Sequence, residues 1–402
     1  MKKLLLSSLL ILSTSVLFAQ KADQMIGVSA LQFARGGAII ASPVDAPSMI
    51  YNPAAIGALS FDKFGFDMGL GVVNPPRKIT SAMGTPMEKT TESGANSYLG
   101  MGNGVVIKLS DKVIFGMAAG GVSGLGTDFP SSTLPDNPNT PFPENVSIVT
   151  KKGLLKITPT FAYKLSDAFV LGASFQIGNQ SLALKSPAFI LPQSDRWGWG
   201  FGVGLIFKPL PNLNLGLSYT SEMQISEYEF NGTSLVPPTG GEGVYTMTMN
   251  SPQLVAFGVS FAPMPKLLVE ADFKWINQSA VMDQIDLVSP TGYVIPLKFG
   301  WDDQMVYAVG AQFAPNKGMQ LMLGWSYGAT PISPENVNNN LGSIAVVEHH
   351  ISIGITRHWG KNVSSTFSYT RGLHNEVISN TTPSNKIEAE FNMFYIELSF
   401  RM

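Results

Sequence analysis

The segment Trp197–Lys208, with the sequence WGWGFGVGLIFK, carries the pattern that decides the fold. Large apolar residues occupy every second position, and the positions between them hold mainly glycine. Because successive side chains of a β-strand point to opposite faces, this period of two predicts a strand with one bulky apolar face and one small or polar face. The Gly-x-Gly spacing does not predict a dinucleotide site, since the glycines recur along the whole segment and no helix follows.

The same alternation runs through most of the chain. It is clear at 64–72, 169–178 and 266–275, and from Phe61 onward about fourteen such segments of roughly ten to twelve residues follow one another. They begin near residues 61, 99, 112, 155, 168, 197, 213, 252, 266, 303, 319, 349, 361 and 391. Segments of this length suit a tilted membrane-spanning strand better than the average soluble strand of about five or six residues.

Short turns and long polar connections alternate between these segments. The short turns lie at 110–111, 166–167, 209–212, 263–265, 315–318 and 359–361, and the long connections at 74–98, 122–154, 179–196, 224–251, 277–302, 330–348 and 372–390. Short periplasmic turns and long extracellular loops are typical of outer-membrane barrels. A sheet in a bilayer also has to close, because an open edge would leave N–H and C=O groups unpaired. We therefore predict an all-β fold, a transmembrane antiparallel β-barrel of about fourteen strands over residues 61–402.

The composition of the chain narrows its function. Only 13% of the 402 residues are charged and the formal net charge is -2, which offers no basic field for nucleic acid. The chain contains no cysteine, which excludes disulfides, thiolate metal sites and a cysteine nucleophile. The neighbours His349 and His350 point to opposite faces of a strand and make a poor metal pair. We expect no enzymatic activity, no metal site and no cofactor.

The first nineteen residues have the layout of a secretory signal peptide. Lys2 and Lys3 precede an apolar core at 4–12, and 17–19 (Leu-Phe-Ala) form a cleavage site. The apolar core is shorter than the roughly 20 residues that a spanning helix needs. We therefore predict an exported chain that begins at Gln20 and resides in the outer membrane of a Gram-negative bacterium, as a monomer surrounded by outer-membrane lipid.

Residues 20–60 differ from the rest of the exported chain because they lack the alternation and are rich in alanine and glycine. About fourteen strands enclose a lumen that side chains alone cannot fill, since that limit lies near eight strands. The apolar residues Ile39, Ile40 and Met49 argue against a disordered tail. We expect this segment to be an N-terminal plug, or hatch, inside the lumen.

Two parts of this plug carry a specific resemblance. Residues 34–38 (Ala-Arg-Gly-Gly-Ala) and 47–56, which include Asn52, Pro53 and Ala54, resemble the hatch of the FadL/TodX family of outer-membrane transporters of long-chain fatty acids and hydrocarbons. Further similarity lies at 157–167, 214–219, 301–303 and 323–331, so that it covers nearly the whole exported chain.

The resemblance implies a transport mechanism. A long-chain fatty acid or similar hydrophobic molecule is captured among the extracellular loops, passes to a pocket in the lumen and leaves sideways through a gap at a kink in the third strand. In this chain the third strand runs into a stretch that contains Gly120, Gly121 and Gly124. Clustered glycine is suited to a bulge or kink, and it is equally suited to a glycine-rich exit into the following loop.

A fatty-acid ligand would need a cation or several donors for its carboxylate. Period two places Lys156 and Lys274 on inward faces, and Arg35 lies in the plug, so these three are the candidates. For any one of them, pairing with an inward carboxylate such as Glu270 or Asp272 is the stronger expectation.

Three other functions remain open from the sequence. One is an uptake channel for aromatic hydrocarbons, and another is a general porin, which requires a wide polar lumen without a plug. The third is a secretion-system scaffold or shuttle on the same fold, for which the proline-rich loop 130–146 is a suitable binding segment for partner proteins. The sequence does not distinguish a fatty acid from a hydrocarbon.

Overall fold

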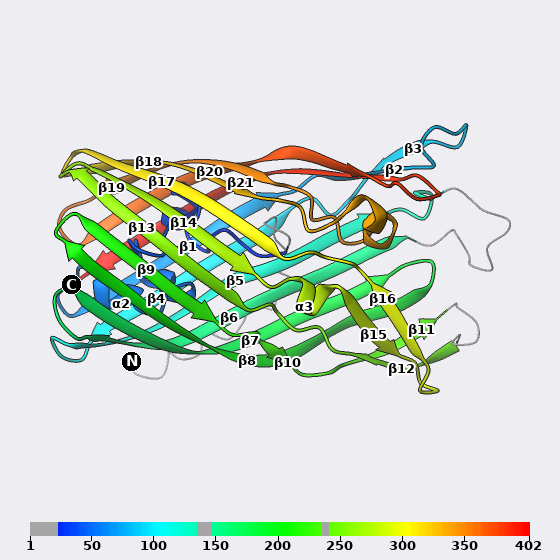
Figure 1. Cartoon of the computed structure of the whole chain (residues 1–402), viewed down its shortest axis with the longest axis horizontal. Coiled ribbons are helices and arrows are strands. Elements are labelled where there is room, and N and C mark those ends of the chain that lie inside the picture. Colours follow the sequence, from blue (N-terminus) through cyan, green and yellow to red (C-terminus); the bar gives the residue numbers. More distant parts are fainter. Residues whose placement is uncertain (1–22, 135–146, 235–240) are drawn as a thin grey trace.

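The computed structural model describes residues 23–134, 147–234 and 241–402. The predicted signal peptide and most of the proline-rich loop lie outside the described residues. A closed barrel of fourteen antiparallel strands makes up most of the molecule (Figure 1). In order around the barrel, the strands are β1 (Phe64–Asn74), β4 (Tyr98–Lys108), β5 (Val113–Phe129), β6 (Ile148–Lys164), β7 (Phe169–Lys185), β8 (Phe189–Leu210), β9 (Leu213–Thr220), β13 (Leu254–Met264), β14 (Leu267–Ile276), β17 (Gln304–Asn316), β18 (Met319–Gly328), β19 (His349–His358), β20 (Val363–Ile378) and β21 (Lys386–Arg401).

Pairing of β21 with β1, from Gly65 opposite Arg401 to Asn74 opposite Asn392, closes the sheet. The predicted fold and number of strands are therefore confirmed. Large apolar side chains such as Leu70, Phe175 and Ile396 point outward and are between 50% and 60% exposed, as a lipid-facing surface requires.

Among the described residues, no helix combines the length and the apolar character that crossing a bilayer requires.

The prediction that residues 122–154 and 179–196 form loops is wrong over much of their length. Strands β5, β6 and β7 each have 17 residues and β8 has 22, so the four extend well beyond the predicted segments. Between β7 and β8 only residues 186–188 lie outside the strands. The apolar alternation ends where the strands leave the bilayer, whereas the backbone pairing continues, and the hydrophobic pattern therefore underestimates their length.

The remaining elements lie at the end of the barrel with the long loops (Figure 1). They are β2 (Arg77–Ser81), β3 (Lys89–Glu92), β10 (Gln224–Ile225), β11 (Tyr228–Ser234), β12 (Gly241–Met247), α3 (Ser279–Met282), β15 (Gln284–Val288), β16 (Val294–Lys298) and the 3-10 helix η2 (Pro334–Asn340). The opposite end carries short turns, and we take it as the periplasmic end.

The plug consists of α1 (Ala30–Ala34), η1 (Ala46–Ile50) and α2 (Ala55–Ala58) with their connections. Ser29 caps α1 by accepting a hydrogen bond from the Gln32 amide, and Asp45 caps η1 by accepting one from the Ser48 amide. Most apolar residues of the plug, Phe33 among them, are buried. The plug therefore supplies an apolar core to a lumen that the barrel side chains do not fill.

Glycines on the inward faces of the strands let the plug approach the wall closely. A Cβ at Gly324 would collide with the backbone of Arg35 and Gly36, and one at Gly172 would collide with the backbone of Pro53 and Ala54. The alternating glycines of the sequence therefore shape the inner wall to fit the plug.

Candidate functional site

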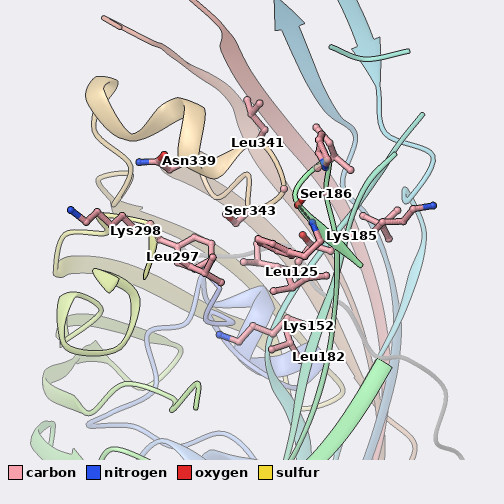
Figure 2. A pocket seen from close by; sticks show the side chains of 18 of the residues that line it. Leu125, Lys152, Leu182, Lys185, Ser186, Leu297, Lys298, Asn339, Leu341 and Ser343 are labelled. Atoms are coloured by element: carbon pink, nitrogen blue, oxygen red, sulfur yellow. Dashed lines mark hydrogen bonds between the residues drawn. The ribbon is translucent and has the colours of Figure 1, made fainter. Parts of the chain in front are cut away.

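A cavity with a volume of about 360 Å³ opens among the extracellular extensions. We call it the outer cavity, and Figure 2 shows Leu125, Leu182 and Leu297 around it. Met249, Met282 and Phe299 add to its apolar lining. Lys185 and Lys298 also belong to the lining, and neither forms an ion pair within the described residues. The arrangement suits a molecule with a large apolar part, because burying each CH₂ group contributes about 0.8 kcal/mol.

Lys152 forms the floor of the outer cavity and binds the start of the plug. Its ammonium group lies 2.6 Å from Oδ2 of Asp23, and both side chains are at most 3% exposed. Asp23 also accepts hydrogen bonds from Ser123 and from Gln278, at 2.9 and 2.8 Å. Burial alone would raise the pKa of Asp23, but the Lys152 charge and these hydrogen bonds hold that pKa below its ordinary value.

Residues 23–25, which we call the N-terminal latch, pair with strand β5. The Met25 amide donates to the Val122 carbonyl, and the Gly124 amide donates to the Asp23 carbonyl, both at 2.9 Å. Gln24 and Ser123 form the antiparallel bridge between these two hydrogen bonds. The latch therefore occupies an edge of β5 that a neighbouring barrel strand would otherwise pair with.

This edge of β5 is available to the latch because the ladder between β4 and β5 stops early. The pairs run from Lys108 opposite Ile114 only as far as Gly102 opposite Gly120. On its other side β5 continues to pair with β6 as far as Phe129, with a register shift between Gly121 and Ser123. The glycine-rich run predicted as a kink or a loop exit is thus a bulged strand that has lost its β4 partner.

A buried polar cluster lies on the lumenal wall directly beside this interruption. Lys156 is opposite Gly120 on β5 and opposite Gly178 on β7. Its side chain is 7% exposed, and its ammonium group has no hydrogen bond or ion pair within the described residues. Gln176 and Gln180 are each two residues from Gly178 along β7, and such diagonal neighbours lie within reach of long side chains.

The two glutamines also have unused hydrogen-bonding capacity. Both amide atoms of Gln176 and Nε2 of Gln180 are buried without a partner in the described part of the chain. Together with Lys156 they form what we call the lumen cluster, which offers one ammonium group and two amide groups to the lumen. Buried polar groups of this kind normally have partners, so the cluster is suited to a polar ligand group.

Arg35 and Lys274 lie elsewhere and bind plug to wall. Arg35 forms an ion pair with Glu270, one of the inward carboxylates expected as partners of the candidate cations. It also donates to the Ser42 carbonyl at 3.0 Å. Lys274 donates to the Gly37 carbonyl at 2.7 Å. Asp272, which lies between Glu270 and Lys274 on β14, accepts hydrogen bonds from the amides of Ile39 and Ile40 in the plug. These contacts occupy Arg35 and Lys274, which leaves Lys156 as the unpaired member of the three predicted candidates within the described residues.

The Asn-Pro-Ala motif also holds the plug in place. Nδ2 of Asn52 donates to the Ile40 carbonyl at 2.8 Å, and its Oδ1 accepts from the Ala54 amide at 3.0 Å. Pro53 and Ala54 pack on the inward glycines of β7 and β8. The motif therefore fixes the bend that lets η1 and α2 fit against the wall.

Several residues of the site escaped the sequence analysis. Asp23 and Lys152 belong to segments without a motif, and only their long-range contact identifies them. Gln176 and Gln180 have the inward parity of β7, so period two places them in the lumen, but nothing in the pattern separates them from ordinary polar lining.

One group of possible metal ligands exists among the described residues, at the extracellular ends of β20 and β21. The ligand atoms of His374, Glu376 and Glu388 lie within 4.8 Å of one another. The ammonium group of Lys386 already pairs with both glutamates, at 3.0 and 2.8 Å. The group is an exposed ion-pair network and lies apart from the outer cavity and the lumen cluster.

A plugged barrel with an apolar outer cavity and an interrupted wall is the architecture of an outer-membrane channel for hydrophobic molecules. The chain belongs to the outer membrane protein transport protein family (OMPP1/FadL/TodX), whose model matches residues 20–392. Members of this family transport hydrophobic compounds across the outer membrane of Gram-negative bacteria. They are transport channels and not enzymes.

Solved structures of the same fold support this assignment. The toluene transporter TodX of P. putida is 19% identical, with a TM-score of 0.76 over 94% of this chain and 99% of that chain. A FadL homologue of Pseudomonas aeruginosa is 15% identical with a TM-score of 0.77, also over 94% and 99%. The toluene transporter TbuX of Ralstonia pickettii is 18% identical with a TM-score of 0.70, over 94% and 98%. No curated protein sequence matches the chain significantly.

Proposed function

We propose that this protein takes up hydrophobic molecules that carry a carboxylate, such as long-chain fatty acids, through the outer cavity, the lumen cluster and the interruption between β4 and β5. The observation that carries the proposal is Lys156 at the point where the ladder ends, which is 7% exposed and has no hydrogen bond or ion pair within the described residues. An unpaired buried ammonium group is costly, and a ligand carboxylate would remove that cost, whereas a neutral hydrocarbon would not.

The outer cavity is the point of capture. Its leucine and methionine lining binds the apolar part of the ligand, and Lys185 and Lys298 attract the carboxylate from the extracellular side. From there the ligand reaches the lumen only past the N-terminal latch, because Asp23 and Lys152 close the floor of the cavity. A carboxylate that approaches Lys152 competes with Asp23 and thereby weakens the latch.

Release of the latch frees the edge of β5 above Gly120. A gap then exists between β4 and β5 on the way from the lumen to the membrane, and because its rim is glycine-rich, few side chains obstruct it. Lateral release avoids both a water-filled channel and the plug, which stays attached through Arg35, Asp272 and Lys274. The function needs no catalytic step and no cofactor.

Uptake of radiolabelled oleate and of radiolabelled toluene by a deletion strain carrying the gene on a plasmid tests the proposal. We expect oleate uptake with the wild-type protein, and Lys156→Met should reduce it several-fold without reducing toluene uptake. Lys386→Met, which removes an ammonium group from the extracellular ion-pair network, is the matched control and should leave both unchanged. Equal uptake of oleate by wild-type and Lys156→Met cells would refute the role of the carboxylate site, and no uptake of either compound by wild-type cells would refute the transport function.

A further inference from the structure

The periplasmic end of the barrel is strongly basic. We define the periplasmic rim as the short turns with three strand residues on either side, together with the two ends of the barrel segment, 61–66 and 399–402. The rim contains ten lysines and arginines, at positions 63, 108, 112, 164, 208, 266, 317, 357, 361 and 401, and three aspartates, at positions 62, 111 and 167. The whole chain has a formal net charge of -2, so the basic charge of the rim is a local feature.

Five of these lysines form a continuous series, which we call the cationic arc. They are Lys63, Lys108, Lys112, Lys164 and Lys208, at the ends of neighbouring strands from β1 to β8. The Lys108 amide donates to the Lys63 carbonyl at 3.0 Å, and the Lys164 amide donates to the Lys112 carbonyl at 2.8 Å. Lys164 also lies within electrostatic range of both Lys108 and Lys208.

The described residues do not neutralise the charge of the arc. None of its five lysines forms an ion pair with any of the described residues. The three aspartates of the rim, at positions 62, 111 and 167, are too few to balance these five lysines. Placing like charges next to one another costs free energy, so an arc of this kind is stabilised by an external anion.

The directions of these side chains indicate the kind of anion. Lys108, Lys164 and Lys208 have the inward parity of their strands and therefore surround the mouth of the lumen instead of facing lipid. Among the rim cations of the described strands, Arg357 is the one with outward parity, and it lies over the ring of Trp359. A site for lipid headgroups would show the opposite distribution.

The size of the arc separates a protein partner from a small anion. Six neighbouring strands at about 4.8 Å spacing extend over roughly 25 Å, far longer than a single carboxylate or phosphate. One side of a typical protein interface covers roughly 800 Å², a patch of similar width. On the opposite side of the mouth a cavity of about 280 Å³, lined by Lys361, His358 and Arg401, continues the basic surface between plug and wall.

From the unpaired charge, the inward direction and the width of the arc, we infer that the periplasmic mouth is a docking surface for an acidic soluble protein of the periplasm. Complementary charge increases the association rate and orients the partner on the mouth. The interaction does not depend on the route that the transported molecule takes through the barrel.

Binding of fluorescent poly-L-glutamate to the protein in phosphatidylcholine nanodiscs tests this inference. The variant Lys108→Gln/Lys112→Gln/Lys164→Gln/Lys208→Gln should bind about tenfold more weakly or worse, because four attractive contacts of modest strength are lost. The matched control Lys78→Gln/Lys89→Gln/Lys151→Gln/Lys386→Gln removes the same number of lysines from the extracellular side, outside the outer cavity, and should bind as the wild type does. The heat-dependent mobility shift on gels confirms that each variant is folded.

Two results would overturn the inference. In the first, the arc variant and the extracellular variant bind poly-L-glutamate equally well. In the second, wild-type protein binds no poly-L-glutamate but retains phosphatidylglycerol from mixed nanodiscs, and the arc variant loses that lipid. This second result would assign the arc to the inner leaflet of the outer membrane.

Discussion

Replacing Asp23 with Asn should release the N-terminal latch from strand β5. Asp23 and Lys152 are buried and 2.6 Å apart, so the substitution leaves a buried ammonium group without its counter-charge. Breaking a buried pair in this way costs about 3–5 kcal/mol, and because Asn keeps an acceptor oxygen we take about 3 kcal/mol. At about 1.4 kcal/mol per factor of ten, the equilibrium between the bound and free latch shifts by about two orders of magnitude.

Hydrogen–deuterium exchange of the protein in nanodiscs measures this shift. The Gly124 and Met25 amides make the two latch hydrogen bonds, so peptides that contain them should exchange roughly 100-fold faster in Asp23→Asn. Peptides from 114–119, where β5 is paired with both β4 and β6, should exchange at the wild-type rate and serve as an internal control.

A second substitution separates the ion pair from a general disturbance. In Asp23→Asn/Lys152→Gln no buried charge is left unpaired, and exchange should return part of the way to the wild-type rate. Wild-type exchange in Asp23→Asn would refute the latch, and equal exchange in the single and the double variant would refute its electrostatic basis.

Three further predictions concern the plug and the latch. Gly172→Ala places a Cβ against the backbone of Pro53 and Ala54, and we expect a loss of about 1–3 kcal/mol, measured as a lower midpoint of the heat-dependent gel shift. Glu270→Ala leaves Arg35 buried without its carboxylate, and a displaced plug should then admit sugars in a liposome-swelling assay that the wild-type protein excludes. Because the pKa of Asp23 is held below its ordinary value of 3.8, the latch is fully charged above that value and is lost as the pH falls through the lower pKa. Latch exchange, corrected for the intrinsic rate, should therefore be constant from about pH 5 to 8 and should rise only in stronger acid.

The sequence predicted the barrel because lipid imposes a strict period of two on every spanning strand. Segments such as Trp197–Lys208 can therefore be recognised as strands from the sequence. The observed strands mostly begin within a few residues of the predicted positions. Where the strands leave the bilayer that constraint disappears, and Ile148 and Phe189, which begin β6 and β8, could not be found from the pattern.

The candidate site was less accessible to sequence analysis, because it depends on which charges meet. Parity placed Lys156 and Lys274 on the inward face of the wall, and the plug prediction placed Arg35 in the lumen; the structure has all three there. Parity could not show that Arg35 reaches Glu270 while Lys156 has no partner in the described part of the chain. The pairing of Asp23 with Lys152 joins residues 129 positions apart, and contacts of that range leave no local signal in one sequence.

The central claim is lateral release between β4 and β5, and joining these two strands across the interruption tests it most directly. The chain has no native cysteine, so Met101→Cys/Gly121→Cys can be joined selectively in cells with a short bifunctional methanethiosulfonate, which attaches to each cysteine through a reducible disulfide. The control Val105→Cys/Met117→Cys joins two residues that already face each other in the intact ladder. The account predicts that joining the first pair abolishes oleate uptake until a reductant cleaves the link, and that joining the control pair has no effect. Undiminished uptake with the first pair joined would contradict it.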